Sequence, residues 1–142
     1  MVSRIRVLLI DDEELYAESL AKVLTRRGME VSTARDGKAG LDWLGDKRAD
    51  VIVLDLKMPG MDGLATLQEI RKRDSMVPVI MLTGHIDLEK VTMALEGGAG
   101  DILLKPCPVD SLAAAIENAA ERKAAAQGLK DIDTGGSSGG KG

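Results

Sequence analysis

Short apolar runs alternate with longer segments of helical periodicity along most of this chain. Runs of apolar and β-branched residues predict five strands, and apolar residues three or four positions apart predict five helices between and after them. The run 51–54 has no polar position and ends near the turn residues Pro59-Gly60, which is typical of a strand buried on both faces. The predicted strands are residues 5–10, 29–33, 51–54, 77–82 and 101–104. The first predicted helix begins at the acids 11–14 and runs to about Arg27. The other four are predicted at 37–46, from Gly63 onward, at 87–96 and from 109 to about Ala126.

Each predicted helix carries an apolar stripe that we expect to face a sheet. The regular alternation of strand and helix predicts an α/β fold with a doubly wound, five-stranded parallel sheet and five helices on its two faces. The inward-facing helical residues are predicted to be Tyr16, Leu20, Val23 and Leu24; Leu41 and Leu44; Leu64, Leu67 and Ile70; Leu88, Val91 and Leu95; and Val109, Leu112 and Ile116.

The length of 142 residues fits one domain, which we place at residues 1–126. From about Gly128 the periodicity is lost and the chain becomes rich in glycine and serine. We therefore expect residues 127–142 to be a flexible linker or an expression tail.

Composition excludes several classes of function. The net charge of -4 and the shortage of aromatic residues (one Trp, one Tyr, no Phe) argue against direct binding of nucleic acid. A single cysteine excludes an internal disulfide and any site with several thiolates. The longest apolar runs are too short to cross a bilayer, and no leader pattern opens the chain, so we expect a cytoplasmic protein without membrane contact.

Chemically active side chains follow four of the five predicted strands. Asp11 and Asp12 come after the first strand, Asp55 after the third, Thr83 after the fourth and Lys105 after the fifth. If the second strand is an edge, these four strand ends meet at one edge of the sheet, where open α/β sheets bind ligands. Three close carboxylates repel one another, so Lys105 and a hard divalent cation such as Mg²⁺ would be needed to balance them. A carboxylate, a hydroxyl, an ammonium group and a metal are the parts of a phosphoryl-transfer site.

Residues 4–125 resemble a response-regulator receiver domain. The resemblance rests on Asp11-Asp12 after an apolar strand, Asp55 in VLDLKMPGMDG, Thr83-Gly84 and Lys105-Pro106, in this order and spacing. It implies a flavodoxin-like strand order of 2-1-3-4-5 and a phosphoryl group accepted by Asp55 from a sensor histidine kinase.

The same resemblance implies a role for each neighbouring residue. Asp12 would bind Mg²⁺ directly, Asp11 mainly through water, and Lys57 through its backbone carbonyl, with Asp55 as a further ligand. Lys105, Thr83 and Gly84 would contact the phosphoryl group.

The resemblance also implies what the switch would act on. The phosphorylated domain would control an output domain or partner, with a possible homodimer through the face of the fourth helix, fifth strand and last helix. The chain would not be an enzyme beyond its own phosphorylation and dephosphorylation.

The sequence departs from this family at two positions. Ile102 stands where the family usually has an aromatic residue whose rotamer follows the switch threonine, and Cys107 stands where Phe is common. The family also implies a cis bond between Lys105 and Pro106, with a trans turn as the alternative. His85 is interpreted as a solvent-facing loop residue.

Three other interpretations remain open at this stage. The acids could form a solvated helix-cap cluster without further purpose, or the chain could be an interaction module in which phosphorylation is vestigial. A metal-dependent phosphatase of the haloacid-dehalogenase type would need a second Asp two residues after the nucleophile, where this chain has Lys57.

Overall fold

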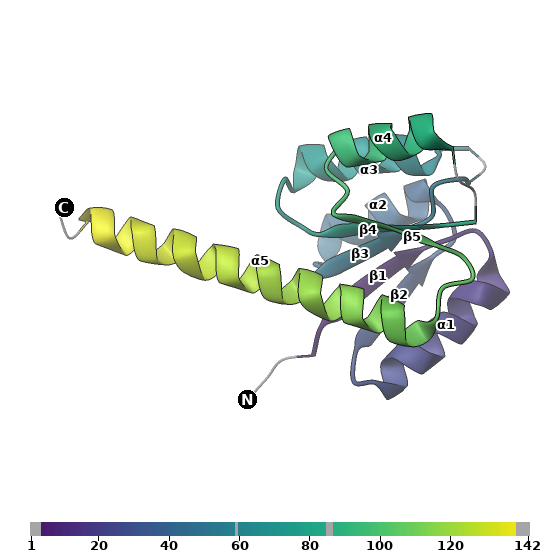
Figure 1. Cartoon of the computed structure of the whole chain (residues 1–142), viewed down its shortest axis with the longest axis horizontal. Helices are drawn as coiled ribbons and strands as arrows, with labels where there is room; N and C mark the ends of the chain where they lie inside the picture. Colours follow the sequence, from purple (N-terminus) through teal and green to yellow (C-terminus); the bar gives the residue numbers. More distant parts are fainter. Residues whose placement is uncertain (1–3, 59, 85–86, 139–142) are drawn as a thin grey trace.

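The computed structural model describes residues 4–58, 60–84 and 87–138, with the side chains of its last helix described as far as Gly128. Strands and helices alternate along the whole of this range, as the sequence predicts (Figure 1). The elements are β1 (Arg6–Ile10), α1 (Glu14–Arg26), β2 (Glu30–Ala34), α2 (Gly37–Asp46), β3 (Val51–Leu54), α3 (Gly63–Arg73), β4 (Val79–Thr83), α4 (Leu88–Glu96), β5 (Asp101–Leu104) and α5 (Val109–Ser138).

The five strands form one parallel sheet in the order β2-β1-β3-β4-β5, which confirms the expected fold. Ile10 of β1 pairs with Leu54 of β3, so the residues that follow these two strands start at the same level of the sheet. β2 is an edge strand and β3 is central. The sheet therefore brings the carboxyl ends of β1, β3, β4 and β5 to one edge.

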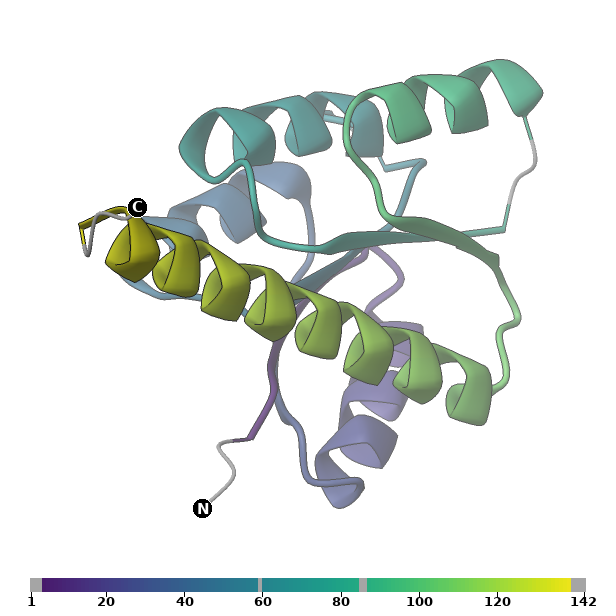
Figure 2. The same cartoon turned by 60° about the vertical axis from the view of Figure 1, so that its left-hand side comes forward.

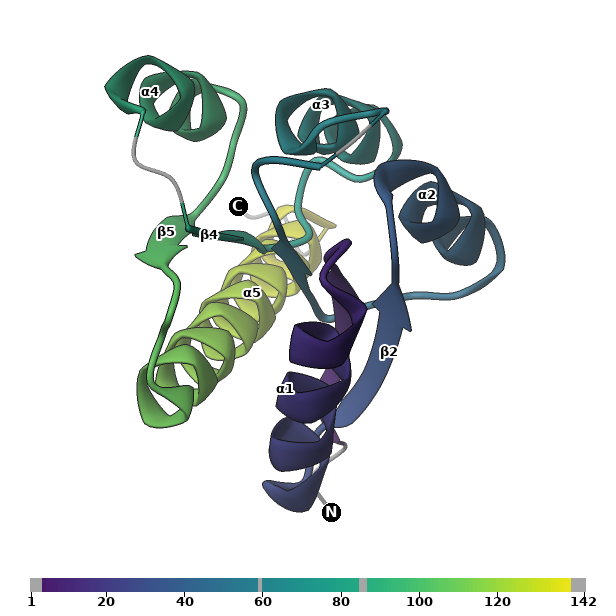
Figure 3. The same ribbon diagram turned by 90° about the vertical axis from the view of Figure 1, so that its right-hand side faces the viewer.

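Helices cover both faces of the sheet. Figure 3 shows α2, α3 and α4 on one face and α1 and α5 on the other. The four residues of β3 are fully buried between these layers, as predicted for an entirely apolar strand. Leu67 and Ile70 of α3 fill one side of the core, and Leu20 and Leu24 of α1 fill the other.

The predicted inward face of α4 is wrong for Leu88 and Leu95, although Val91 is half-buried. Leu88 is 77% exposed and Leu95 is 52% exposed, whereas Ala94 is fully buried. α4 packs beside α3 through small residues, because Ala94 and Gly97 allow a close approach that a leucine would prevent. The side chains of Leu88, Met93 and Leu95 are consequently exposed to solvent.

The predicted end of the last helix near Ala126 is also wrong, since α5 continues to Ser138. Gly28, which follows the end of α1, has a positive φ of +93°. Gly128 does not adopt a positive φ and stays within the helix. Figures 1 and 2 show the second half of α5 extending beyond the sheet. None of the described helices combines the length and apolar character needed to cross a lipid bilayer.

Candidate functional site

The carboxyl edge of the sheet brings together the predicted site residues. Asp11 follows β1, Asp55 follows β3, Thr83 ends β4 and Lys105 follows β5. Backbone hydrogen bonds fix their spacing: the Asp55 amide donates to the Ile10 carbonyl at 3.0 Å, and the Lys105 amide donates to the Thr83 carbonyl at 2.8 Å. Asp11, Asp55 and Thr83 are buried although they are polar, which is uncommon unless such groups have a specific role.

The Lys105 ammonium lies among three carboxylates. Its Nζ is 2.7 Å from Asp11 Oδ2, 2.8 Å from Glu13 Oε1 and 3.4 Å from Asp55 Oδ2. The contact with Asp11 is an ion pair, and Lys105 donates hydrogen bonds to Glu13 and Asp55. One cation thus holds together acids from two separate loops.

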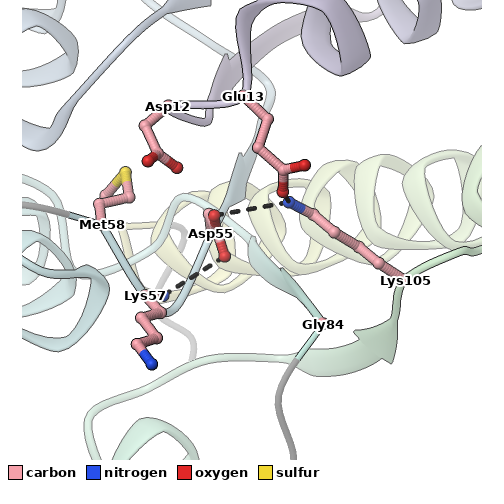
Figure 4. A pocket seen from close by; sticks show the side chains of 7 residues that line it. All are labelled: Asp12, Glu13, Asp55, Lys57, Met58, Gly84 and Lys105. Carbon is pink, nitrogen blue, oxygen red and sulfur yellow. Dashed lines mark hydrogen bonds and ion pairs between the residues drawn. The ribbon is translucent and has the colours of Figure 1, made fainter.

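An open cavity of about 420 Å³ lies over Asp55. Figure 4 shows the Asp55 carboxylate between Asp12 and Lys105, while the Lys57 side chain points away. The Lys57 amide nevertheless donates to Asp55 Oδ1 at 3.3 Å. Asp55 therefore presents a carboxylate that is held from two sides and accessible from the cavity. Its lining residues are Asp12, Glu13, Asp55, Lys57, Met58, Gly84 and Lys105.

Burial and charge shift the proton affinities of the site in known directions. Burial raises the pKa of Asp55, and nearby Asp11 raises it further, although Lys105 lowers it in part. Burial by itself would lower the pKa of Lys105, but its contacts with Asp11 and Glu13 and the negative charges of Asp11 and Asp55 outweigh it and raise that pKa above its usual range. Lys105 is consequently a permanent cation at neutral pH.

The three aspartates can provide a metal site. Asp11, Asp12 and Asp55 each offer a carboxylate oxygen, and these oxygens lie within 4.8 Å of one another. Asp12 is exposed, while Asp11 accepts a hydrogen bond from the Glu13 amide at 2.9 Å. A set of carboxylate oxygens with room for water suits Mg²⁺ better than a thiophilic metal.

The loop after β3 is held by contacts that the sequence interpretation did not include. A Cβ on Gly63 would meet the Asp55 carbonyl oxygen and lie 2.6 Å from Leu56 Cα, so only glycine permits α3 to begin so close to the acceptor loop. The Gly63 amide donates to the Leu56 carbonyl at 3.0 Å, and Asp62 caps α3 by accepting from the Ala65 amide at 2.9 Å. In the sequence, the pair Asp62-Gly63 before the apolar stripe of α3 is the signal that could have indicated this tight start of the helix.

Three further site residues were missed. Glu13 was interpreted only as a helix-terminal acid, Met58 lines the cavity while buried, and the ring of Tyr16 lies beneath Lys105. Glu13 directly follows the Asp11-Asp12 pair, and this position in the acidic run could have indicated a place at the site. Contacts of Met58 and Tyr16 depend on side-chain directions across separate elements, for which the sequence carries no local signal.

The positions that depart from the family are also placed. Ile102 is half-buried against the core on the α2–α4 face, and Cys107 is a half-buried free thiol on the other face. Burial raises the pKa of the Cys107 thiol. The Lys105–Pro106 bond is cis. His85 lies outside the described residues.

Comparisons with known proteins agree with this arrangement. Residues 7–117 match the family model of the response regulator receiver domain. The chain is 40% identical over 111 residues to the DNA-binding transcriptional regulator NtrC of Klebsiella pneumoniae, covering 78% of this chain and 24% of that protein. It is 42% identical over 100 residues to the transcriptional regulatory protein AfsQ1 of Streptomyces coelicolor, covering 70% of this chain and 44% of that protein. The chain thus spans about a quarter of the length of the NtrC relatives.

Solved structures show the same fold. A CheY-like receiver domain protein from Methanospirillum hungatei superposes with a TM-score of 0.83 and 27% identity, covering 85% of this chain and 97% of that one. NtrX from Brucella abortus, solved in complex with ADP, gives a TM-score of 0.86 and 32% identity over 92% of this chain and 30% of that one. The chain belongs to the family of response-regulator receiver domains, whose general role is to accept a phosphoryl group in two-component signalling.

Proposed function

We propose that Asp55 is the phosphoacceptor and that a sensor histidine kinase is its donor. The observation that carries this proposal is the position of Asp55, a carboxylate at the floor of an open cavity with a cation 3.4 Å from Oδ2. An ionised Asp55 oxygen would attack phosphorus, the bond from phosphorus to the donor imidazole nitrogen would break, and the imidazole would leave with its electron pair and take up a proton. The product is an acyl phosphate on Asp55.

Receiver domains bind Mg²⁺ at an acidic pocket, and the donor set of this chain fits that ion. Asp12 and Asp55 would hold it directly, Asp11 mainly through water, and the Lys57 backbone carbonyl would add a neutral oxygen. When bound, Mg²⁺ supplies positive charge against the phosphoryl oxygens.

The remaining residues would act on the phosphoryl group itself. The Lys105 ammonium would exchange a carboxylate contact for a phosphoryl oxygen, because it already lies between Asp11 and Asp55. The Thr83 hydroxyl would donate to another oxygen from the end of β4. At Gly84 a Cβ would meet open space, so the protein itself does not need glycine there, and the bare backbone leaves room for the incoming group.

Intact-mass measurement after incubation with Mg²⁺ and a small acyl phosphate tests the acceptor. We expect a single phosphoryl adduct that is lost in base. The Asp55→Asn variant should show no adduct, whereas Asp42→Asn, which changes an exposed aspartate on α2, should be modified like the parent. An adduct of equal size on Asp55→Asn would place the acceptor elsewhere.

We further propose that the chain catalyses only its own phosphorylation and dephosphorylation. Lys57 occupies the position where a haloacid-dehalogenase-type phosphatase needs its second Asp, and its side chain points away from Asp55 (Figure 4). Incubation with a phosphomonoester such as p-nitrophenyl phosphate should give no turnover. Repeated Mg²⁺-dependent turnover that is abolished by Asp55→Asn would instead identify a hydrolase.

The face of α4, β5 and α5 is our proposed site for an output domain, a partner or a second copy. Leu88 and Leu95 of α4 and Leu104 at the end of β5 are exposed there at 77%, 52% and 48%. Analytical ultracentrifugation of the phosphorylated chain should show association that Leu95→Lys abolishes. Leu15→Lys, at an 80% exposed position on α1, is the matched control. Association that survives Leu95→Lys unchanged would assign the contact to another face.

A further inference from the structure

The ring of Tyr16 forms part of the surroundings of the Lys105 ammonium. Tyr16 lies in the first turn of α1, and its ring centroid is 4.9 Å from Lys105 Nζ. This distance is within the range of a cation–π interaction. The ring is partly buried and packs against the core between the sheet, α1 and α5, so its position is fixed by the fold.

The hydroxyl of Tyr16 is not the part of the side chain that the fold uses. It is buried and has no hydrogen-bond partner among the described residues. A hydroxyl removed from water without gaining a partner destabilises the folded state. A phenyl ring would fill the same place without that destabilisation. The polar interaction that Tyr16 makes is therefore the one between its aromatic face and the Lys105 ammonium.

The ring acts on the cation in a way that the carboxylates do not. Lys105 Nζ lies closer to Asp11 and Glu13, at 2.7 and 2.8 Å, than to Asp55, at 3.4 Å. Each carboxylate draws the ammonium toward itself, and phosphorylation of Asp55 would change this balance. The ring carries no net charge and attracts the cation toward its face whichever carboxylate is its partner.

We propose that Tyr16 is a positioning residue for phosphoryl transfer, with its aromatic face holding the Lys105 ammonium within reach of Asp55. The proposal rests on the proposed role of Asp55 as acceptor. It requires an aromatic ring at position 16 and does not require the hydroxyl.

Two substitutions separate the ring from the hydroxyl. Tyr16→Phe keeps the ring, and Tyr16→Leu replaces it with a side chain that still fills much of the core. We expect the single-turnover phosphorylation rate of Tyr16→Phe, measured at saturating Mg²⁺ and acyl phosphate, to stay within about twofold of the parent, and that of Tyr16→Leu to fall about three- to tenfold. Leu20→Ala, one turn further along α1 and in the same core cluster, controls for loss of stability and should keep the parental rate per folded molecule.

A second measurement does not depend on phosphorylation. The NMR signals of the Lys105 ammonium and its neighbouring methylene, identified by their loss in Lys105→Met, should show the ring-current shift of an overlying aromatic face. This shift should persist in Tyr16→Phe and Leu20→Ala and disappear in Tyr16→Leu. An unchanged shift in Tyr16→Leu, or a rate for Tyr16→Phe as low as that of Tyr16→Leu, would overturn the proposal. A parent chain with the shift but no adduct on Asp55 would instead contradict the proposed function.

Discussion

Replacing Lys105 by methionine removes the cation from the acidic cluster while keeping most of the apolar volume of the side chain. The side chains of Lys105, Asp11 and Asp55 are only 11%, 1% and 6% exposed, so this is the breaking of a buried ion pair. Such a change costs about 3–5 kcal/mol, because the remaining charges stay buried without a partner. Glu13 is 61% exposed and can turn toward water, so its contact adds little. We therefore expect the free energy of unfolding at pH 7.5, without Mg²⁺, to fall by about 3 kcal/mol.

The loss should depend on pH with a definite sign. In the parent, burial raises the pKa of Asp55 and Lys105 partly lowers it, so removing Lys105 raises the folded-state pKa of Asp55 further. A carboxyl whose pKa is raised by folding favours the folded state at low pH, and this contribution is lost as pH rises through the folded pKa. The deficit of Lys105→Met should consequently shrink as the pH is lowered from 7.5. The raised pKa of Lys105 itself contributes stability that is lost only in alkali, so it does not alter this window.

Urea unfolding measures the effect directly. With a slope of about 2 kcal/mol/M, a loss of about 3 kcal/mol moves the midpoint down by about 1.5 M. Mg²⁺ should stabilise Lys105→Met more than the parent, because it can replace the missing cation. Lys72→Met, at a 72% exposed lysine paired with Glu69, should change stability by less than about 0.5 kcal/mol. A deficit for Lys105→Met below about 1 kcal/mol, or one that does not shrink as the pH is lowered, would refute the assignment of Lys105 as the essential counter-ion of the buried acids.

The acceptor loop and its neighbours give further expectations. Gly63→Ala should lower the free energy of unfolding by about 2–3 kcal/mol, because its Cβ would overlap the backbone of Leu56. The control Gly45→Ala, which has open space around it in α2, should raise the free energy of unfolding by up to about 1 kcal/mol. Equal effects of the two substitutions in thermal melts would contradict the close approach at Gly63. Asp62→Ala should cost about 1 kcal/mol through loss of the α3 cap, measured by urea titration, and a neutral result would show that the cap is not needed. Glu13→Gln should leave the phosphorylation rate within about threefold of the parent, since its carboxylate is mostly solvated and the pair is weak. A clearly larger loss of rate would give Glu13 a direct role.

The sequence predicted the fold and the central residues of the site because both depend on periodic patterns. Entirely apolar β3 had to be central, and the carboxyl ends of neighbouring parallel strands must share an edge, which places Asp11, Asp55, Thr83 and Lys105 together. Neither conclusion needs knowledge of an individual side-chain direction.

Other features could not be predicted in this way. Leu88 and Leu95 have the spacing of a core face, but the close packing of α4 at Ala94 turns them to solvent. The ring of Tyr16 meets Lys105 only because α1 and the loop after β5 converge in three dimensions. Gly128 is a common helix stop in sequence, yet nothing at that position forces the backbone out of the helix.

Because α5 is long, a small tilt at its packed end displaces its far end by a larger distance. Its first three turns are anchored by Leu112, Ile116 and Ala119 in the core, close behind the loop that carries Lys105. Lys123 and Ala126 are still half-buried, and beyond them residues 127–138 extend about 18 Å at 1.5 Å per residue. A tilt of about 5° at the anchored base would move the far end by roughly 1.5 Å, the scale on which packed helices shift in switching proteins. A small rearrangement at the carboxyl edge of the sheet can thus produce a larger displacement at the far end of α5, well outside the sheet.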